Sequence, residues 1–284
     1  MRIVHSFTSV NCDDDKLFLH LTYFILSCIY AKESGFEIVV HCDERSKEIL
    51  KIAPYDEIIT DLEGVIPPSN NCIYAWGKFE AMKNEPLGTI HIDGDVFLKS
   101  KGLQQVLDFT EYDCIVQSVE HNKIYRGTSE YVWNQNAMLF STCEYPKWAK
   151  RECDSMYNCG VVGFNNQELK DEYFKTYKIM LERYNKTGFC VSNSTPDIII
   201  EQQFLKDLVE HRNYKVKFVL PYCDCFDTLC TEANHAHYQH VIGHAKRPNL
   251  ERTLLIIKKH NPDIYEQLIC IRENIRKNKK FILL

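Results

Sequence analysis

The sequence lacks any uninterrupted run of about 18 apolar residues, the length that a membrane-spanning helix requires. Its beginning, MRIVHSFTSV, has the pattern of a β-strand and lacks a long hydrophobic signal core. There is no internal repeat and no low-complexity segment. Of the 284 residues, 45% are hydrophobic and 26% are charged, which is typical of a soluble globular protein with one large domain or two small ones.

A disulfide framework is not expected, although the chain contains 13 cysteines. The number is odd, the chain is large, and Cys28, Cys114 and Cys190 lie in apolar segments. Reduced thiols in a cytosolic protein explain this pattern better. Three cysteines and three histidines also lie between Cys223 and His240, but their spacing lacks the C-x2-C pair that is usual in structural zinc sites. Zinc binding there is the less favoured alternative.

Basic residues are scarce outside the C-terminal segment. From Lys246 to Leu284 the chain has ten Lys and Arg against four Asp and Glu, which leaves a net charge of −11 on the rest. Nucleic-acid binding depends on positive charge that faces the phosphates. An acidic body of this kind therefore argues against a nucleic-acid partner.

Strand and helix patterns alternate along the first hundred residues. We expect strands over residues 2–7, 37–41, 57–60 and 89–92, with helices over 16–32, 44–52 and 74–84. This alternation predicts an α/β fold with a mostly parallel central sheet and helices on both faces. The second half is less regular, with strands over 114–117, 158–165 and 216–220 and helices over 167–184 and 197–209. A polar and aromatic stretch covers 119–148, and its residues 125–148 are interpreted as core and loop packing, with a platform for a sugar as the less favoured alternative.

Two carboxylates follow the strand that we expect at residues 89–92. Asp93 and Asp95 can turn toward one point, while Gly94 lets the backbone pass close to a ligand. Mg²⁺ or Mn²⁺ is typically held by such a pair, with substrate phosphates in the other positions. Asp-Gly is also a common turn dipeptide, so the segment alone leaves a metal site and a turn equally open. Asp43 also follows a strand end, and we expect it to face the same cleft as Asp93.

A second chemical cluster lies at His240, Gly243 and Lys246. A neutral imidazole is a good ligand for a borderline metal ion. The glycine allows an anion to approach the backbone, and the lysine supplies a point charge that suits a phosphate. A solvated turn would give the same loose pattern. Together with Asp93 and Asp95, however, the cluster supplies the groups that a metal-bound diphosphate needs.

In their order along the chain, these motifs resemble those of metal-dependent glycosyltransferases with the GT-A fold. The closest resemblance is to the retaining group that contains glycogenin and bacterial lipopolysaccharide galactosyltransferases. It is carried by WGKFEA with Lys78, D-G-D at 93–95, N-C-G at 158–160, EQQFL with Glu201 and Gln202, and H-x-x-G-x-x-K from His240 to Lys246. Glu201 stands where the family usually has Asp, and Arg247 separates the lysine from Pro248.

The resemblance implies a GT-A-like catalytic domain over residues 1–248, followed by a basic amphipathic helical tail over 249–284. Such an enzyme transfers a sugar from a nucleoside diphosphate, here expected to be UDP, to an acceptor hydroxyl. The implied metal ligands for Mn²⁺ or Mg²⁺ are Asp93, Asp95 and His240. The donor-binding residues that the resemblance implies are Lys78, Asp93, Asn158, Gly160, Gly243 and Lys246, and we add Asp43 because of its place at a strand end. The implied catalytic residues are Glu201, Gln202 and Lys78.

Purely structural roles remain open for several of these residues, and other classes of protein remain open for the chain. Lys78 could lie on the solvated face of its helix, and Asn158 and Gly160 could be turn residues only. A non-catalytic nucleotide-sugar-binding protein would keep the same cleft. A phosphatase of the haloacid-dehalogenase type also carries D-x-D after a strand, but it has Gly-Thr where this chain has Val96-Phe97. The acceptor could be a saccharide, a lipid-linked sugar or a protein.

The tail has one apolar stripe, formed by Ile264, Leu268, Ile271 and Ile275 at helical spacing. Basic residues lie beside the stripe, and the apolar residues 281–284 follow it. The favoured interpretation is a helix that packs on the acidic body of a cytoplasmic protein. The alternative is peripheral contact with the inner face of a membrane, which would bring the active site to a lipid-linked acceptor.

Overall fold

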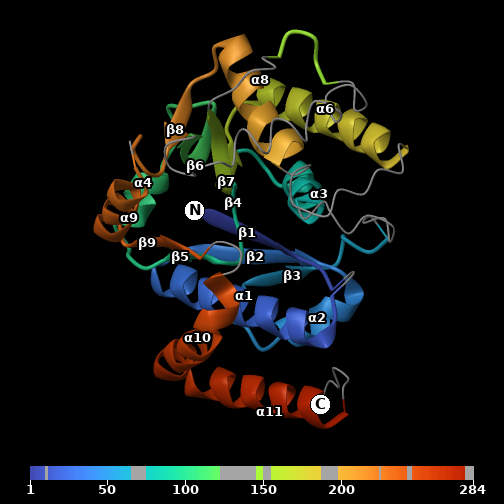
Figure 1. The fold of residues 1–284 in the computed structure, drawn as a ribbon, viewed down its shortest axis with the longest axis vertical. Coiled ribbons are helices and arrows are strands. Elements are labelled where there is room, and N and C mark those ends of the chain that lie inside the picture. Colours follow the sequence, from blue (N-terminus) through green and yellow to red (C-terminus); the bar gives the residue numbers. More distant parts are fainter. Residues whose placement is uncertain are drawn as a thin grey trace.

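A seven-stranded mixed sheet forms the centre of the molecule, in the order β3-β2-β1-β4-β7-β6-β8 (Figure 1). The computed structural model describes residues 1–9, 12–64, 75–121, 145–149, 155–186, 198–223, 225–241 and 245–278. The strands of the large sheet are β1 (Arg2–Phe7), β2 (Glu37–Cys42), β3 (Glu57–Ile59), β4 (Ile90–Ile92), β6 (Cys114–His121), β7 (Ser155–Phe164) and β8 (Val216–Phe218). A separate two-stranded sheet pairs β5 (Val96–Leu98) with β9 (Tyr238–His240).

The pairing of the strands confirms the predicted α/β fold with a mostly parallel sheet. Strands β3, β2, β1 and β4 run parallel to one another, and β8 runs parallel to β6. Strand β7 is antiparallel to both of its neighbours, β4 and β6. The carboxyl end of β4 therefore lies at the middle of the sheet, where the parallel part meets the antiparallel part.

Helices cover both faces of the sheet, as the alternating pattern predicted (Figure 1). They are α1 (Asp14–Glu33), α2 (Glu44–Leu50), α3 (Trp76–Asn84), α4 (Leu103–Leu107), α6 (Gln167–Lys186), α8 (Phe204–Arg212), α9 (Phe226–His235), α10 (Lys246–His260) and α11 (Pro262–Asn278). One apolar core joins α1, α10 and α11 to the parallel strands. A second core joins α3, α6 and α8 to β6 and β7 on the opposite face.

The C-terminal helices α10 and α11 pack against α1. The stripe of Ile264, Leu268, Ile271 and Ile275 is buried in the core that contains α1. Packing on the body, the favoured interpretation, is confirmed for residues up to 278, and the stripe is not available to a membrane surface. Helix α10 spans the predicted domain boundary at residue 248, and the division into two parts stays a prediction. The apolar residues 281–284 lie outside the described residues.

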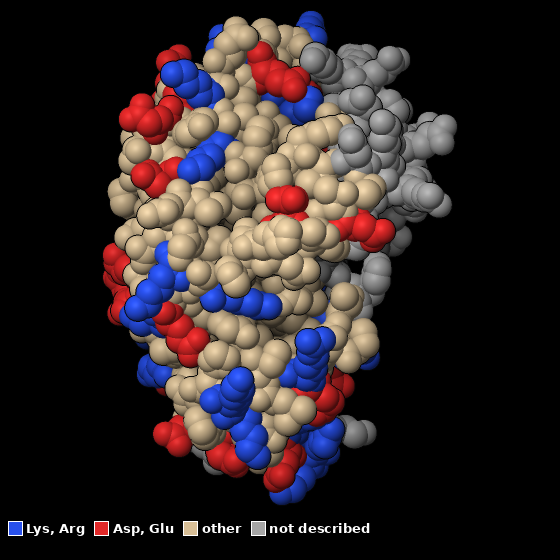
Figure 2. Space-filling view, turned by 90° about the vertical axis from the view of Figure 1, so that its left-hand side faces the viewer, with Lys and Arg blue, Asp and Glu red and all other residues tan. Residues whose placement is uncertain are grey.

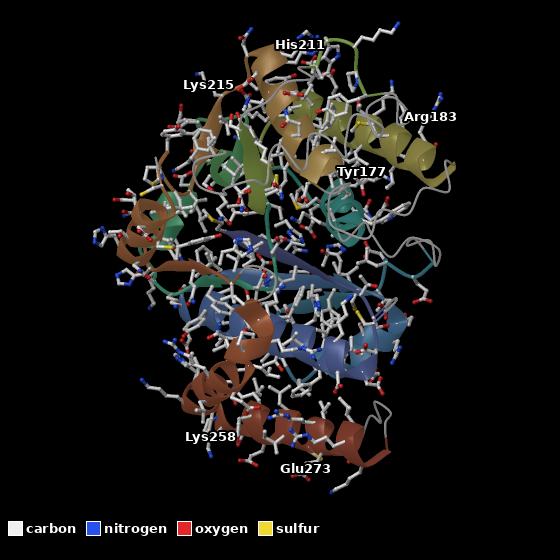
Figure 3. All side chains as sticks on the ribbon, viewed as in Figure 1. Tyr177, Arg183, His211, Lys215, Lys258 and Glu273 are labelled. Atoms are coloured by element: carbon white, nitrogen blue, oxygen red, sulfur yellow. The ribbon has the colours of Figure 1, made fainter. Side chains whose placement is uncertain are left out.

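The outward faces of these helices are charged. Lys258 on α10 and Glu273 on α11 lie at the end of the molecule away from α6 and α8 (Figure 3). In Figure 2, Lys and Arg gather on the lower half of the visible face, mixed with Asp and Glu. None of the helices within the described ranges is long and apolar enough to cross a membrane.

Candidate metal and donor site

The small β5–β9 sheet brings the D-x-D segment and the His240 segment together. His240 pairs with Val96 across this sheet, and the Val241 N–H donates to the Asp95 carbonyl at 3.0 Å. One ligand atom each from Asp93, Asp95 and His240 lies within 4.8 Å of the others. These three side chains form a group that could hold a metal ion, as the sequence predicted.

The D-G-D segment is a turn as well as a source of ligands. The Val96 N–H donates to the Asp93 carbonyl at 2.9 Å, which closes the turn between β4 and β5. A Cβ atom at Gly94 would lie 2.1 Å from the ring of Phe24 on α1. The residue between the carboxylates is therefore limited to glycine by the packing of α1. The turn is confirmed, and the same segment keeps two carboxylates that could serve as metal ligands.

Lys246 and His240 contact the buried Asp95 carboxylate. Lys246 Nζ, at the first residue of α10, lies 2.7 Å from Asp95 Oδ2, and His240 Nε2 lies 3.4 Å from Asp95 Oδ1. Burial alone would raise the pKa of Asp95, but its contacts with His240 and Lys246 hold it well below its usual range. Burial would likewise lower the pKa of His240, but the carboxylate of Asp95 raises it. The site thus keeps Asp95 ionised.

Lys78 is buried and points into the site from α3, so the solvated-face alternative is wrong. Its Nζ donates to Glu201 Oε1 at 2.6 Å and to the Cys159 carbonyl at 2.8 Å, and it lies 2.8 Å from Asp93 Oδ1. Burial alone would lower the pKa of Lys78, but the two carboxylates raise it above its usual value. The pKa of Glu201 is raised, mainly by its burial. Lys78 therefore links the D-x-D segment to Glu201.

Glu201 and Gln202 lie on a π-helical turn, η1 (Ile198–Gln203), that precedes α8. The sequence predicted one regular helix over 197–209, and the structure differs by this wider turn (residue 197 is not described). The hydroxyl of Tyr173 donates to the backbone carbonyl of Glu201 at 3.1 Å. Lys78 contacts the side-chain carboxylate of Glu201. Gln202 is half-buried. Turns of this type are frequent at functional sites because they redirect side chains.

Asn158 and Gly160 are not turn residues, since both lie in β7 beside the site. The Asn158 Oδ1 atom accepts from the Gly160 N–H at 2.8 Å, and its amide donates to the Glu120 carboxylate. The Asp93 N–H donates to the Gly160 carbonyl at 2.9 Å. A Cβ atom at Gly160 would lie 2.6 Å from Cε1 of His240, so glycine leaves the space that the imidazole occupies.

One predicted donor-binding residue, Asp43, makes its contacts outside this cluster. Asp43 is buried and caps α2, where its carboxylate accepts from the Ser46 N–H at 2.8 Å and the Ser9 N–H at 2.6 Å. Its contacts account for a local structural role, and donor binding stays a prediction. Gly243 lies outside the described residues, as do Tyr125, Tyr131 and Trp133 of the aromatic stretch.

Sequence reasoning missed Gln117 and Glu120, which β6 places beside His240 and Asn158. Neither belongs to a motif, and only the strand pairing brings them to the site. Across the described ranges, Asp93, Asp95 and His240 form the one group of three or more His, Cys, Asp or Glu with metal-binding spacing. The described part of the Cys223–His240 segment therefore offers no zinc site of its own.

Residues 1–271 match the model of a family of unknown function, DUF6734. The chain belongs to this family. A comparison with curated proteins found no significant match.

Among solved structures, this DUF6734 chain is similar to the galactosyltransferase LgtC in complex with donor and acceptor sugar analogues. The identity is 12%, over 77% of this chain and 73% of that chain, with a TM-score of 0.40. Mouse xyloside xylosyltransferase 1 shares 11% identity over 76% of this chain and 84% of that chain, with a TM-score of 0.42. The inositol-1-phosphate CTP transferase from T. maritima shares 8% identity over 98% and 96%, with a TM-score of 0.41. These likenesses are distant.

Proposed function

We propose that the chain is a metal-dependent glycosyltransferase that moves a sugar from a nucleoside diphosphate, UDP in the simplest case, to an acceptor hydroxyl. One observation carries the proposal. Asp93, Asp95 and His240 converge at the carboxyl end of the central strand β4, where Lys246 contacts Asp95 and the Lys78–Glu201 pair contacts Asp93. These residues would hold a cation and bind the diphosphate and the sugar of the donor.

The donor set fits Mn²⁺ or Mg²⁺. Two carboxylates and one imidazole suit such ions, which keep further positions for water and phosphate oxygens. Asp93 is the most open of the three, with 33% of its side chain exposed, whereas Asp95 is buried. When bound, the cation would supply a Lewis acid for the diphosphate that leaves.

The lysines of the site would have separate tasks. Lys246 has 20% of its side chain exposed and contacts Asp95, so it can turn from that carboxylate to a phosphate oxygen. There its charge would stabilise the leaving diphosphate as negative charge develops. Lys78 is held by three oxygen atoms inside the site. It would keep Asp93 and Glu201 in place and neutralise part of their charge.

Glu201 and Gln202 would face the reacting sugar. As the bond to the diphosphate breaks, the sugar becomes oxocarbenium-like and electron-poor. The carboxylate of Glu201, held by Lys78 at 2.6 Å, and the amide oxygen of Gln202 are suited to stabilise that charge. The resemblance to the retaining group supports retention of configuration. The acceptor class, whether a saccharide, a lipid-linked sugar or a protein, is left to experiment, as is the predicted cytoplasmic location.

A non-catalytic nucleotide-sugar-binding protein would use the same residues, so the test needs two stages. First, thermal unfolding is followed with UDP-, GDP- and CDP-sugars, with and without Mn²⁺. Saturation to 100 times the dissociation constant stabilises the native state by about 2.7 kcal/mol, so the true donor stands out. Second, a labelled form of that donor is incubated with the wild-type chain and with Glu201→Gln. We expect sugar release or transfer by the wild type and a loss of about 100-fold in the variant. Binding without any turnover would contradict the enzymatic role.

A further inference from the structure

Gln117 occupies an irregular point of the sheet. The pairing of β6 with β7 shifts register between Val116 and Ser118, so Gln117 has no regular partner on β7. Its carbonyl instead accepts from the Leu220 N–H at 2.8 Å, which anchors its backbone on the β8 side. Opposite Gln117, β7 has three residues (159–161) between the paired Asn158 and Val162, so the extra residues of this irregularity lie on β7. Such bulges are frequent next to active sites.

The Gln117 side chain reaches the predicted metal ligand His240. Gln117 is 4% exposed, and its Oε1 atom accepts from His240 Nδ1 at 2.8 Å and from the Tyr238 hydroxyl at 2.6 Å. Gly160 leaves the room for this contact, since a Cβ atom there would lie 2.5 Å from Gln117 Oε1 and 2.8 Å from His240 Nδ1. The irregularity and Gly160 both lie on β7, opposite Gln117, and Gly160 leaves the space for this hydrogen bond.

The hydrogen bond from His240 to Gln117 determines which ring nitrogen of His240 carries the proton and which keeps a lone pair for a metal ion. An imidazole that donates from Nδ1 to an amide oxygen carries its proton there and keeps its lone pair on Nε2. The Nε2 atom is the one that faces Asp95, at 3.4 Å from Oδ1. In known metal sites, the partner of the second ring nitrogen fixes both the tautomer and the orientation of the ring.

We propose that Gln117 is a positioning residue that holds His240 in the Nδ1–H tautomer, with Nε2 directed at the cation. The inference rests on the proposed metal site and adds to it a residue that lies in none of the sequence motifs. It does not depend on which sugar or acceptor the chain uses.

The first measurement needs neither metal nor substrate. Nitrogen-15 NMR of the metal-free wild-type chain, at a pH where His240 is neutral, reports which ring nitrogen carries the proton, with His240→Gln used to assign the signal. We expect the proton on Nδ1. In Gln117→Leu the acceptor is lost, and we expect a mixture of tautomers. In Gln117→Glu an acceptor oxygen is kept, and the Nδ1–H tautomer should be restored. A proton on Nε2 in the wild type would overturn the inference.

The second measurement titrates Mn²⁺ alone and follows the free ion by electron paramagnetic resonance. Loss of such a partner typically weakens metal binding about 10- to 100-fold, so we expect that loss in Gln117→Leu. Gln117→Glu should bind Mn²⁺ within a few-fold of the wild type. Tyr238→Phe is the matched control, because it removes the other hydrogen bond to Oε1 and leaves His240 in contact with Gln117.

The outcomes separate the two proposals. If Gln117→Leu binds Mn²⁺ like the wild type, or Tyr238→Phe loses as much affinity, Gln117 does not position His240. A failure of the wild type to bind Mn²⁺ would remove the metal site and this inference with it. Normal Mn²⁺ binding without sugar transfer would contradict the proposed function and leave the role of Gln117 intact. If the leucine variant does not fold, the wild-type tautomer and the Gln117→Glu titration still decide the question.

Discussion

Two buried networks of charged side chains lie against the central strands, and they differ in how completely their atoms are paired. In the first, which we name the Glu85 network, Glu85 accepts from Arg2 Nε at 2.7 Å, from Arg2 Nη2 at 3.0 Å and from His41 Nε2 at 3.0 Å. The other ring nitrogen of His41 contacts Asp61 at 2.9 Å. Fixed protein groups thus surround the Glu85 carboxylate on several sides.

The second network, at Asp93, Asp95 and His240, also contains buried charges, but its ligand atoms converge on one point and Asp93 is one-third exposed. Lys246 is 20% exposed and can turn away from Asp95, whereas Lys78 is held inside the site by three oxygen atoms. The comparison teaches that burial of charge is not by itself a mark of function. A more specific indication of function is a group of metal-type ligand atoms that lie close together and remain partly exposed to solvent.

The largest effect is expected from the Glu85 network and concerns stability. Glu85→Ala leaves Arg2 and His41 without their shared buried partner, and breaking a buried pair typically costs about 3–5 kcal/mol of unfolding free energy. Glu37→Ala is the matched control, since Glu37 also pairs with Arg2 but is 52% exposed. It should cost less than about 1 kcal/mol. Urea denaturation measures both values, and equal values would contradict the distinction between the networks.

The next effect concerns metal binding. Asp95→Asn removes a charged ligand from the convergent group, and we expect Mn²⁺ affinity to fall at least about 100-fold, or about 2.7 kcal/mol. Asp61→Asn changes a carboxylate of the Glu85 network in the same way and should leave Mn²⁺ affinity within about two-fold. Titration of Mn²⁺ by electron paramagnetic resonance distinguishes them. A similar loss in both variants would mean that the two networks are not functionally different.

A smaller effect is expected at Lys246. Lys246→Met removes the charge assigned to the diphosphate, so UDP should bind about 10-fold more weakly, or about 1.4 kcal/mol, while uridine is unaffected. Mn²⁺ alone should bind at least as tightly, because the ammonium that contacts Asp95 is gone. Lys258→Met, on the outer face of the same helix, is the control. If UDP and uridine lose affinity equally, Lys246 has a general structural role.

Much of the fold could be predicted because the longer strands and helices have a visible periodicity of apolar and polar residues. Strand β1 lies over the residues predicted, β2 differs by one residue, and α6 begins where predicted. The sequence did not predict β5 and β9. Each has three residues, too few for a period to be visible, and they pair across a long separation in sequence. That pairing is nevertheless what joins His240 to the D-x-D segment.

In the candidate site too, residue types could be predicted from the sequence, but contacts that depend on the tertiary fold could not. Asp93, Asp95 and His240 were expected to share one cation because their residue types and motif spacing suit metal binding. The structure brings the three side chains together. Lys78 could not be assigned from sequence, since only the fold decides whether a helical lysine faces inward. The contact of Gln117 with His240 depends on a shift in strand register and on the space left by Gly160. Neither feature has a sequence signature.

The central claim is that the convergent group holds a cation on which nucleotide binding depends. Isothermal titration calorimetry of UDP into the wild-type chain, once with Mn²⁺ and once with EDTA, tests it most directly. The account predicts measurable binding with Mn²⁺ and a loss of at least about 10-fold in affinity when the metal is removed. Equal affinity under the two conditions would contradict it.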